Sequence, residues 1–187
     1  MIWKNYSHLE GSHAFLSPSR YHWLRYSEDR LVDAYRSHER VALGSKYHRI
    51  ASDLIKLSIR LPNTAASLNS FVNDAIGFRM GSEVLLYYSV NCYGTADAIS
   101  FTDGILRIHD LKTGKSEGSI DQLLIYAGLF CLDYEINTLK ELREIFLRIY
   151  HDGGVIEFSP SPGDLKEVVD KIIDADMIIR GINAFVL

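Results

Sequence analysis

Two acidic residues and a lysine are arranged around a predicted turn. Asp97 lies six residues before the dipeptide Asp103-Gly104, and Asp110 lies six residues after it. Asp-Gly between apolar segments is a strong signal for a two-residue β-hairpin loop, so residues at equal distances from the loop face each other. Lys112 follows Asp110 by two residues and points to the same face of its strand. Two carboxylates and an ammonium group on one face suit a divalent metal ion and phosphate chemistry.

The register of the hairpin decides whether the two acids meet. With a two-residue loop, Ile99 faces Ile108, and the Cβ atoms of Asp97 and Asp110 lie roughly 5 Å apart. A three-residue loop would place Asp97 opposite His109 instead. Both strands otherwise carry apolar residues on either side, which is typical of a central sheet buried on two faces and favours the first register.

Facing carboxylates repel each other, so a cation or a shared proton between them is expected. Mg²⁺ takes oxygen ligands, and one or two carboxylates suffice where phosphate and water complete its shell. The Leu111 carbonyl offers a further oxygen, and Lys112 could orient a water molecule or stabilise developing negative charge. The simpler alternative is a surface hairpin in which Asp110 and Lys112 form an ordinary ion pair, because Asp-x-Lys is a common sequence.

Helices and strands with clear sequence signals surround this hairpin. Ser17 and Pro18 are typical of a helix start, and the helical spacing of apolar residues continues through Tyr35. Further helices are predicted at 37–61, 67–78, 118–133 and 164–180, and further strands at 83–90, 144–151 and 155–158. The order of helices, three strands, a helix, a hairpin and a helix predicts an α/β (α+β) fold with a central mixed β-sheet flanked by helices.

Length and composition are those of a single globular domain over residues 1–187, mainly helical in 1–80 and with the sheet core in 82–187. No run of about 18 apolar residues occurs, so no membrane span is expected. The two cysteines, Cys92 and Cys131, form no C-x-x-C pair, which excludes a cysteine zinc or iron–sulfur site within the chain and favours a reducing, cytoplasmic location. The N-terminus also lacks the apolar core of a secretory signal.

Charge is distributed unevenly along the chain. Residues 1–60 carry ten Lys or Arg against six Asp or Glu, whereas residues 61–187 carry ten against 18. The basic excess at 1–60 could form a phosphate-facing stripe on the predicted helices, or it could be a solvated helix surface. Charge by itself slightly favours the solvated surface.

Four motifs in this order resemble the RecB-type branch of the PD-(D/E)xK nuclease superfamily. That branch carries G-[ST]-x-x-H on a helix, then G-x-x-D, then (D/E)-x-K-(T)-G, then Q-x-x-x-Y. The corresponding segments here are Gly44-Ser45-Lys46-Tyr47-His48, Gly94-Thr95-Ala96-Asp97, Asp110-Leu111-Lys112-Thr113-Gly114 and Gln122-Leu123-Leu124-Ile125-Tyr126. Ser17-Pro18-Ser19 followed by Trp23 is similar to the start of many such nucleases, and the resemblance covers about residues 15–130.

The resemblance implies a restriction-endonuclease-like core and a role for each motif residue. Asp97 and Asp110 would be ligands of Mg²⁺ or Mn²⁺, with His48 as a further ligand from its helix. Lys112 would be the catalytic lysine, and Gln122 and Tyr126 would contact DNA or brace the site. Each motif also has a structural interpretation: His48 as a surface or core-edge histidine, and Tyr126 as an ordinary core residue. Glu83 could supply another acid to the metal, although an exposed acid at a strand end is favoured.

The function implied is a metal-dependent DNA exonuclease of recombination, repair or phage DNA processing, acting in a bacterial or phage-infected cell. DNA would be its partner, with homo-oligomerisation and an annealing protein or helicase as further options. No G-x-x-x-x-G-K-[ST] motor motif and no iron–sulfur cysteine cluster accompany the nuclease motifs. Two alternatives stay open: a nuclease-like DNA-binding or inhibitory protein without turnover, and an endonuclease subunit.

Overall fold

The computed structural model describes residues 14–113, 118–152 and 154–184. They divide into two compact units, one up to Ser45 and one from Lys46. Within the described ranges, no helix combines the length and apolar character needed to cross a bilayer. Whether the two units act as one domain over residues 1–187, as the sequence predicts, stays a prediction.

The N-terminal helical region breaks at a different place from the one predicted. A 3₁₀-helix, η2 (Pro18–Arg25), precedes α1 (Glu28–Lys56), which runs unbroken through the expected boundary at residues 36–37. The break falls earlier, where the hydroxyl of Ser27 accepts the N–H of Arg30 and so caps the new helix. No proline or glycine lies between 28 and 41, so nothing interrupts the helical hydrogen bonds at 36–37.

Helix α1 also ends five residues before the predicted end at Leu61. Ser58 has a left-handed backbone, with φ 54, and the N–H of Ile59 donates to the carbonyl of Leu54. This left-handed termination satisfies the last carbonyls of the helix. The helix therefore ends before Pro62, and the proline does not cause its termination.

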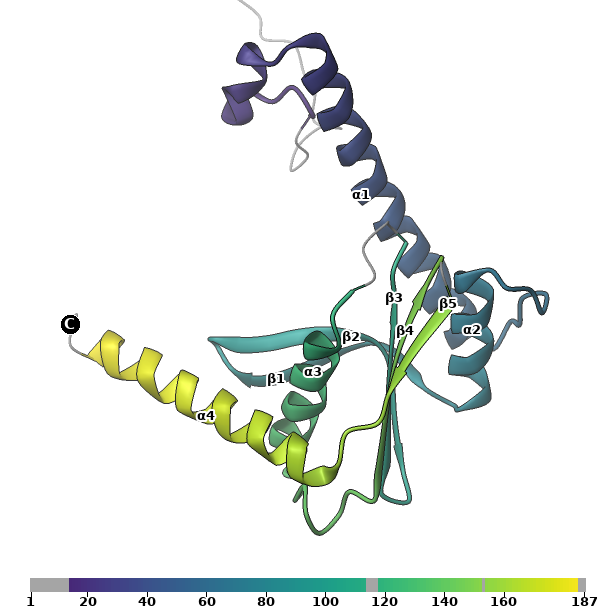
Figure 1. Cartoon of the computed structure of the whole chain (residues 1–187), viewed down its shortest axis with the longest axis vertical. Helices are drawn as coiled ribbons and strands as arrows, with labels where there is room; N and C mark the ends of the chain where they lie inside the picture. The colour runs from purple at the N-terminus through teal and green to yellow at the C-terminus, as the bar shows by residue number, and fades with distance from the viewer. Residues whose placement is uncertain (1–13, 114–117, 153, 185–187) are drawn as a thin grey trace, which may run out of the picture. The chain divides into compact units, whose positions relative to one another are not determined.

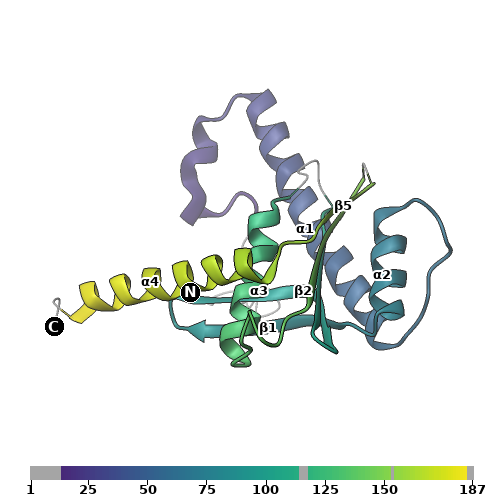
Figure 2. The same cartoon turned by 60° about the horizontal axis from the view of Figure 1, so that its bottom comes forward.

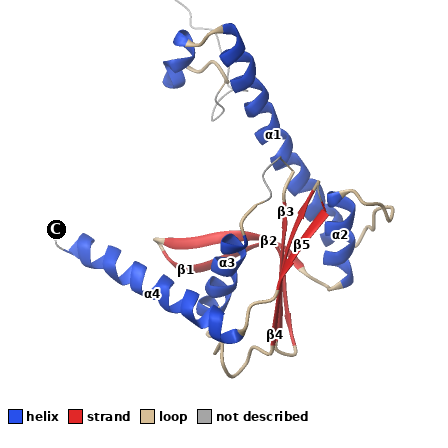
Figure 3. Ribbon diagram, viewed as in Figure 1, coloured by secondary structure: helices blue, strands red, loops and turns tan. Residues whose placement is uncertain are grey.

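The second unit is built on a five-stranded mixed sheet, as the sequence predicts (Figure 3). Neighbouring strands follow the chain order, and all pairs are antiparallel except β3 with β4. The parallel pair requires a crossover connection, which contains helix α3. The strands are β1 (Gly81–Ser89), β2 (Cys92–Thr102), β3 (Ile105–Leu111), β4 (Glu144–His151) and β5 (Gly154–Phe158).

Helices cover both faces of the sheet (Figures 1 and 2). On one face lies α3 (Ile120–Asp133), which also packs against α4 (Pro162–Ala184). On the other face lie α2 (Ser67–Gly77) and the last turns of α1. The central sheet is therefore buried on two sides, which confirms the expectation drawn from its apolar strands.

Two apolar cores correspond to the two faces. The α3 face buries residues from α3 and from all strands but β5, among them Leu86, Leu106, Ile108, Leu123, Leu129, Ile145 and Leu147. The opposite face buries Ala51, Ile55, Phe71, Val72, Ala75, Met80, Ala98, Leu111 and Tyr150. Burial on the opposite face holds residues 46–56 of α1 against the sheet, next to the strands that carry the acidic residues.

Candidate metal centre

The β2–β3 hairpin has the two-residue loop that the sequence predicts. Asp103 and Gly104 both have positive φ angles, 51 and 76, as a type I′ turn requires. Thr102 pairs with Ile105, and the ladder continues through Ile99 with Ile108. The alternative three-residue register, with Asp97 opposite His109, is thereby excluded because Ala98 is the partner of His109.

The ladder between β2 and β3 ends at Ala98 and His109, one pair before the two acids. Beyond this point the N–H of Leu111 donates to Oδ2 of Asp97 at 2.8 Å. A side-chain oxygen thus takes the place of the next backbone acceptor. Asp97 is therefore tied to β3 by its carboxylate and not by a backbone pair.

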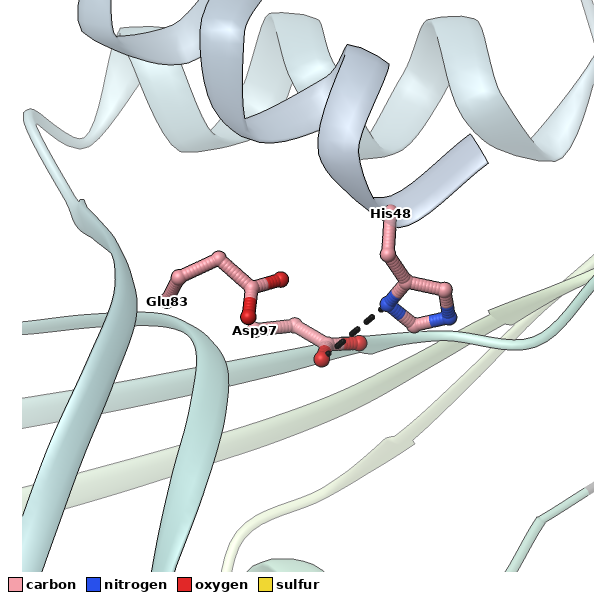
Figure 4. A group of neighbouring side chains, drawn as sticks. All are labelled: His48, Glu83 and Asp97. Atoms are coloured by element: carbon pink, nitrogen blue, oxygen red, sulfur yellow. Dashed lines mark ion pairs between the residues drawn. The ribbon is translucent and has the colours of Figure 1, made fainter. Parts of the chain in front are cut away.

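His48 reaches the same carboxylate from α1 (Figure 4). Its Nδ1 lies 3.2 Å from Oδ1 of Asp97. One helical turn further along α1, the Ser52 hydroxyl lies 2.9 Å from the Ser82 hydroxyl in β1. This contact docks α1 on β1 and places His48 beside the strand that carries Glu83.

Glu83 belongs to this group, although the sequence favoured a plain exposed strand-end acid. It is exposed, but it lies within β1, between the pairs Ser82–Ala98 and Val84–Ala96, and so directly across from Asp97. Among the described residues, His48, Glu83 and Asp97 form a group whose ligand atoms all lie within 4.8 Å of one another. Counting back from the turn after Ser89 would set Glu83 against Ala98, and an irregularity between Tyr87 and Ser89 shifts the register by one residue to Asp97.

A second group forms around Lys112 on the α3 face. Its Nζ donates to Oδ1 of Asp110 at 3.1 Å and lies 2.9 Å from Oδ2. The same Nζ donates to Oε1 of Gln122, on α3, at 3.0 Å. The lysine is thus held between a strand acid and a helix amide.

Tyr126 completes this arrangement through Gln122 rather than by touching the lysine. Nε2 of Gln122 donates to the Tyr126 hydroxyl at 3.5 Å, which is a long hydrogen bond. The Tyr126 ring packs on Gly94, where an added Cβ would lie 2.9 Å from Cε1. Gly94 therefore has a structural role: it leaves the space in which the tyrosine stands.

Protonation in the site follows burial and neighbouring charge. The hydrogen bond to Asp97 raises the pKa of His48, although burial works against it. Burial raises the pKa of Asp110, and the negative charge of Asp97 adds to this, while Lys112 opposes both. Partial burial raises the pKa of the exposed Glu83 as well, again with a contribution from Asp97. The acids act on one another electrostatically, which is the repulsion expected from the sequence.

The donor set fits a divalent cation. One imidazole and two carboxylates are ligand types that bind Mn²⁺ and similar ions, and Mg²⁺ accepts the carboxylates. Two ligands on opposite sides of one Mg²⁺ lie roughly 4.2 Å apart. Atoms within 4.8 Å of one another therefore need only small side-chain rotations to share an ion. A proton on His48 would compete with the ion for the same nitrogen.

The structure brings the motif residues together in two adjoining groups. His48 and Asp97, two of the four predicted metal ligands, stand in the group with Glu83. Asp110 contacts Lys112, and Leu111 contributes its amide to Asp97, while the role of its carbonyl stays a prediction. Gly114, the last residue of the Asp-x-Lys motif, lies outside the described residues.

The sequence matches no protein-family model, and no curated protein resembles it at a significant level.

Proposed function

We propose that this chain is a metal-dependent deoxyribonuclease that hydrolyses DNA phosphodiester bonds as an exonuclease. The proposal is carried by one observation: residues from separate sequence motifs converge, with Lys112 held between Asp110 and Gln122 beside the group of His48 and Asp97. The resemblance of the motifs to RecB-type nucleases supports the same assignment. Such an exonuclease would act in recombination, repair or phage DNA processing.

The chain's own residues can be given roles. The predicted ligands are His48, Asp97 and Asp110, with the Leu111 carbonyl as a further oxygen. When bound, Mg²⁺ or Mn²⁺ supplies Lewis-acid polarisation of a phosphoryl group. Lys112 has its ammonium group positioned by two acceptors, so it can stabilise negative charge on the phosphate in the transition state. Gln122 holds the lysine, and Tyr126 holds Gln122.

One observation favours a second candidate, a DNA-binding or inhibitory protein without turnover. Asp97 and Asp110 each already have a basic partner, His48 for Asp97 and Lys112 for Asp110. These pairs relieve part of the repulsion in the absence of any ion. Against this, Asp110 is buried, and a protein that only binds DNA has no need to bury an acid beside another.

The test is digestion of end-labelled linear DNA and closed circular DNA in Mg²⁺, in Mn²⁺ and in EDTA. We expect linear DNA to be degraded only with a divalent ion, and Lys112→Ala and Asp110→Asn to reduce the rate at least about 100-fold. Lys140→Ala, an exposed lysine outside the site, should leave it unchanged. Circular dichroism would check that each variant is folded.

Normal digestion of linear DNA by folded Asp110→Asn protein would refute the proposed assignment. Cutting of closed circular DNA would instead indicate an endonuclease. DNA binding that is equal in EDTA and in Mn²⁺, with no cleavage in either, would favour the second candidate.

A further inference from the structure

We infer that Glu83 is a metal ligand, which completes with His48 and Asp97 a site of one imidazole and two carboxylates for Mn²⁺ or a similar divalent ion. The motifs of the chain assign no role to Glu83. The inference rests on the proposed metal-dependent function, and it adds to the ligands of that function an acid that the motifs leave out.

The first argument is the position of Glu83, in β1, relative to the acids of the two strands that follow it in the sheet. Ladder pairs on either side of it set Glu83 across from Asp97, and the β2–β3 register continued by one residue sets Asp97 in line with Asp110. Of the two acids flanking Asp97, only Glu83 joins the compact group with His48. Docking of Ser52 on Ser82 holds the helix with His48 against the residue next to Glu83.

The second argument is the difference in environment between the two acids. Glu83 is exposed, so an ion can reach its carboxylate from solvent. The Asp110 side chain is only 5% exposed, and both of its oxygens lie within 3.1 Å of Lys112. An ion bound at Glu83 leaves the ion pair of Asp110 and Lys112 in place, and it relieves the electrostatic repulsion between Glu83 and Asp97.

The third argument is the chemistry of the donor set. Imidazole nitrogen suits transition-type ions, and carboxylates suit Mn²⁺ as well as Mg²⁺, so the mixed set selects Mn²⁺. Mg²⁺ is usually held by one or two carboxylates with several waters and gains less from an imidazole. Asp110 in addition holds the ammonium group of Lys112.

The experiment measures Mn²⁺ binding to the full chain by the loss of the free-ion electron paramagnetic resonance signal, with no DNA present. The variants are Glu83→Gln, Asp97→Asn and Glu135→Gln. Glu135 is a matched control, because it is an exposed glutamate with a left-handed backbone, φ 56 against 52 for Glu83, outside the site. We expect Glu83→Gln and Asp97→Asn to weaken Mn²⁺ binding at least about ten-fold, and Glu135→Gln to bind as the wild type does.

Wild-type affinity in Glu83→Gln would overturn the inference, and loss of binding in Asp97→Asn alone would leave the proposed nuclease function standing. Binding that depends on Glu83 in a protein that does not digest DNA would support the ligand assignment while the proposed function fails. Absence of Mn²⁺ binding by the wild type would overturn both.

Discussion

The acids of the site differ in role because their surroundings differ. Asp110 is buried beside a lysine, Asp97 bonds a backbone amide and a histidine, and Glu83 stands in solvent. Removal of one member of a buried ion pair leaves an uncompensated charge, so Lys112 and Asp110 depend on each other for folding as well as for chemistry. Exposed Glu83 can be replaced with little structural cost, which makes it the cleanest residue for testing metal binding.

His109 shows how the opposite face of β3 is stabilised. Its ring is fully buried, and its Nδ1 lies 3.2 Å from the hydroxyl of Tyr150, which donates to Asp74 at 2.7 Å. Burial lowers the pKa of His109 to about 3, and the positive charges of Arg148 and Arg107 contribute. The imidazole is therefore neutral in the folded chain throughout the mildly acidic range.

This lowered pKa predicts a loss of stability in acid. The unfolded chain binds a proton at His109 below about pH 6.5, whereas the folded chain does so only near pH 3. The contribution of His109 to the free energy of unfolding is thus fully present above pH 6.5 and falls as the pH decreases towards 3. When the pH is lowered from 7.5 to 5.0, the free energy of unfolding of the wild type, measured with urea, should fall by about 2 kcal/mol more than that of His109→Gln, because the glutamine amide does not titrate. Equal losses in the two proteins would show that His109 is not a buried neutral residue.

At the scale of elements, the site depends on how closely α3 approaches β2. The Tyr126 ring occupies the space that a side chain at Gly94 would need. The same helix carries Gln122, which holds Lys112. A change at this contact therefore acts on the lysine through the position of the helix.

Gly94→Ala should destabilise the protein by about 1–3 kcal/mol in urea unfolding, because the new methyl group would lie 2.9 Å from the ring. Gly181→Ala, in α4, is the matched control, since a Cβ there meets nothing within 4 Å. That control should gain roughly 0.5–1 kcal/mol from the better helix propensity of alanine. Addition of Tyr126→Ala to Gly94→Ala should cost less than the two single changes together. Unchanged stability in Gly94→Ala would mean that α3 does not lie this close to β2.

At the scale of the whole molecule, ion binding should appear as thermal stability. An ion that binds only the folded chain raises the free energy of unfolding by about 2.7 kcal/mol at 100 times its dissociation constant. The melting temperature of the full chain should rise with MnCl₂ and return to its starting value with excess EDTA. The control is NaCl at equal ionic strength, which only screens the repulsion among Glu83, Asp97 and Asp110. An equal rise in NaCl would contradict specific ion binding.

Much of the second unit could be predicted because its signals are local. Asp103-Gly104 specified a type I′ turn, the turn specified the register, and the register placed the acids on adjacent strands. The mixed sheet followed from the order of elements, since α3 between β3 and β4 allows a parallel pair. The helix break was misplaced because capping by Ser27 depends on a single hydroxyl and not on apolar periodicity.

What the sequence by itself determined was the strands, the turn and the register of the β2–β3 hairpin, because each depends on backbone preferences over a few residues. Only the tertiary structure decided which acids lie in the group with His48 and which acid contacts Lys112. Those choices depend on how α1 and α3 pack on the sheet: α1 brings His48 to Asp97, next to Glu83, and α3 brings Gln122 to Lys112. Such contacts join residues from different elements of the chain, and burial of two separate cores sets the distances between them.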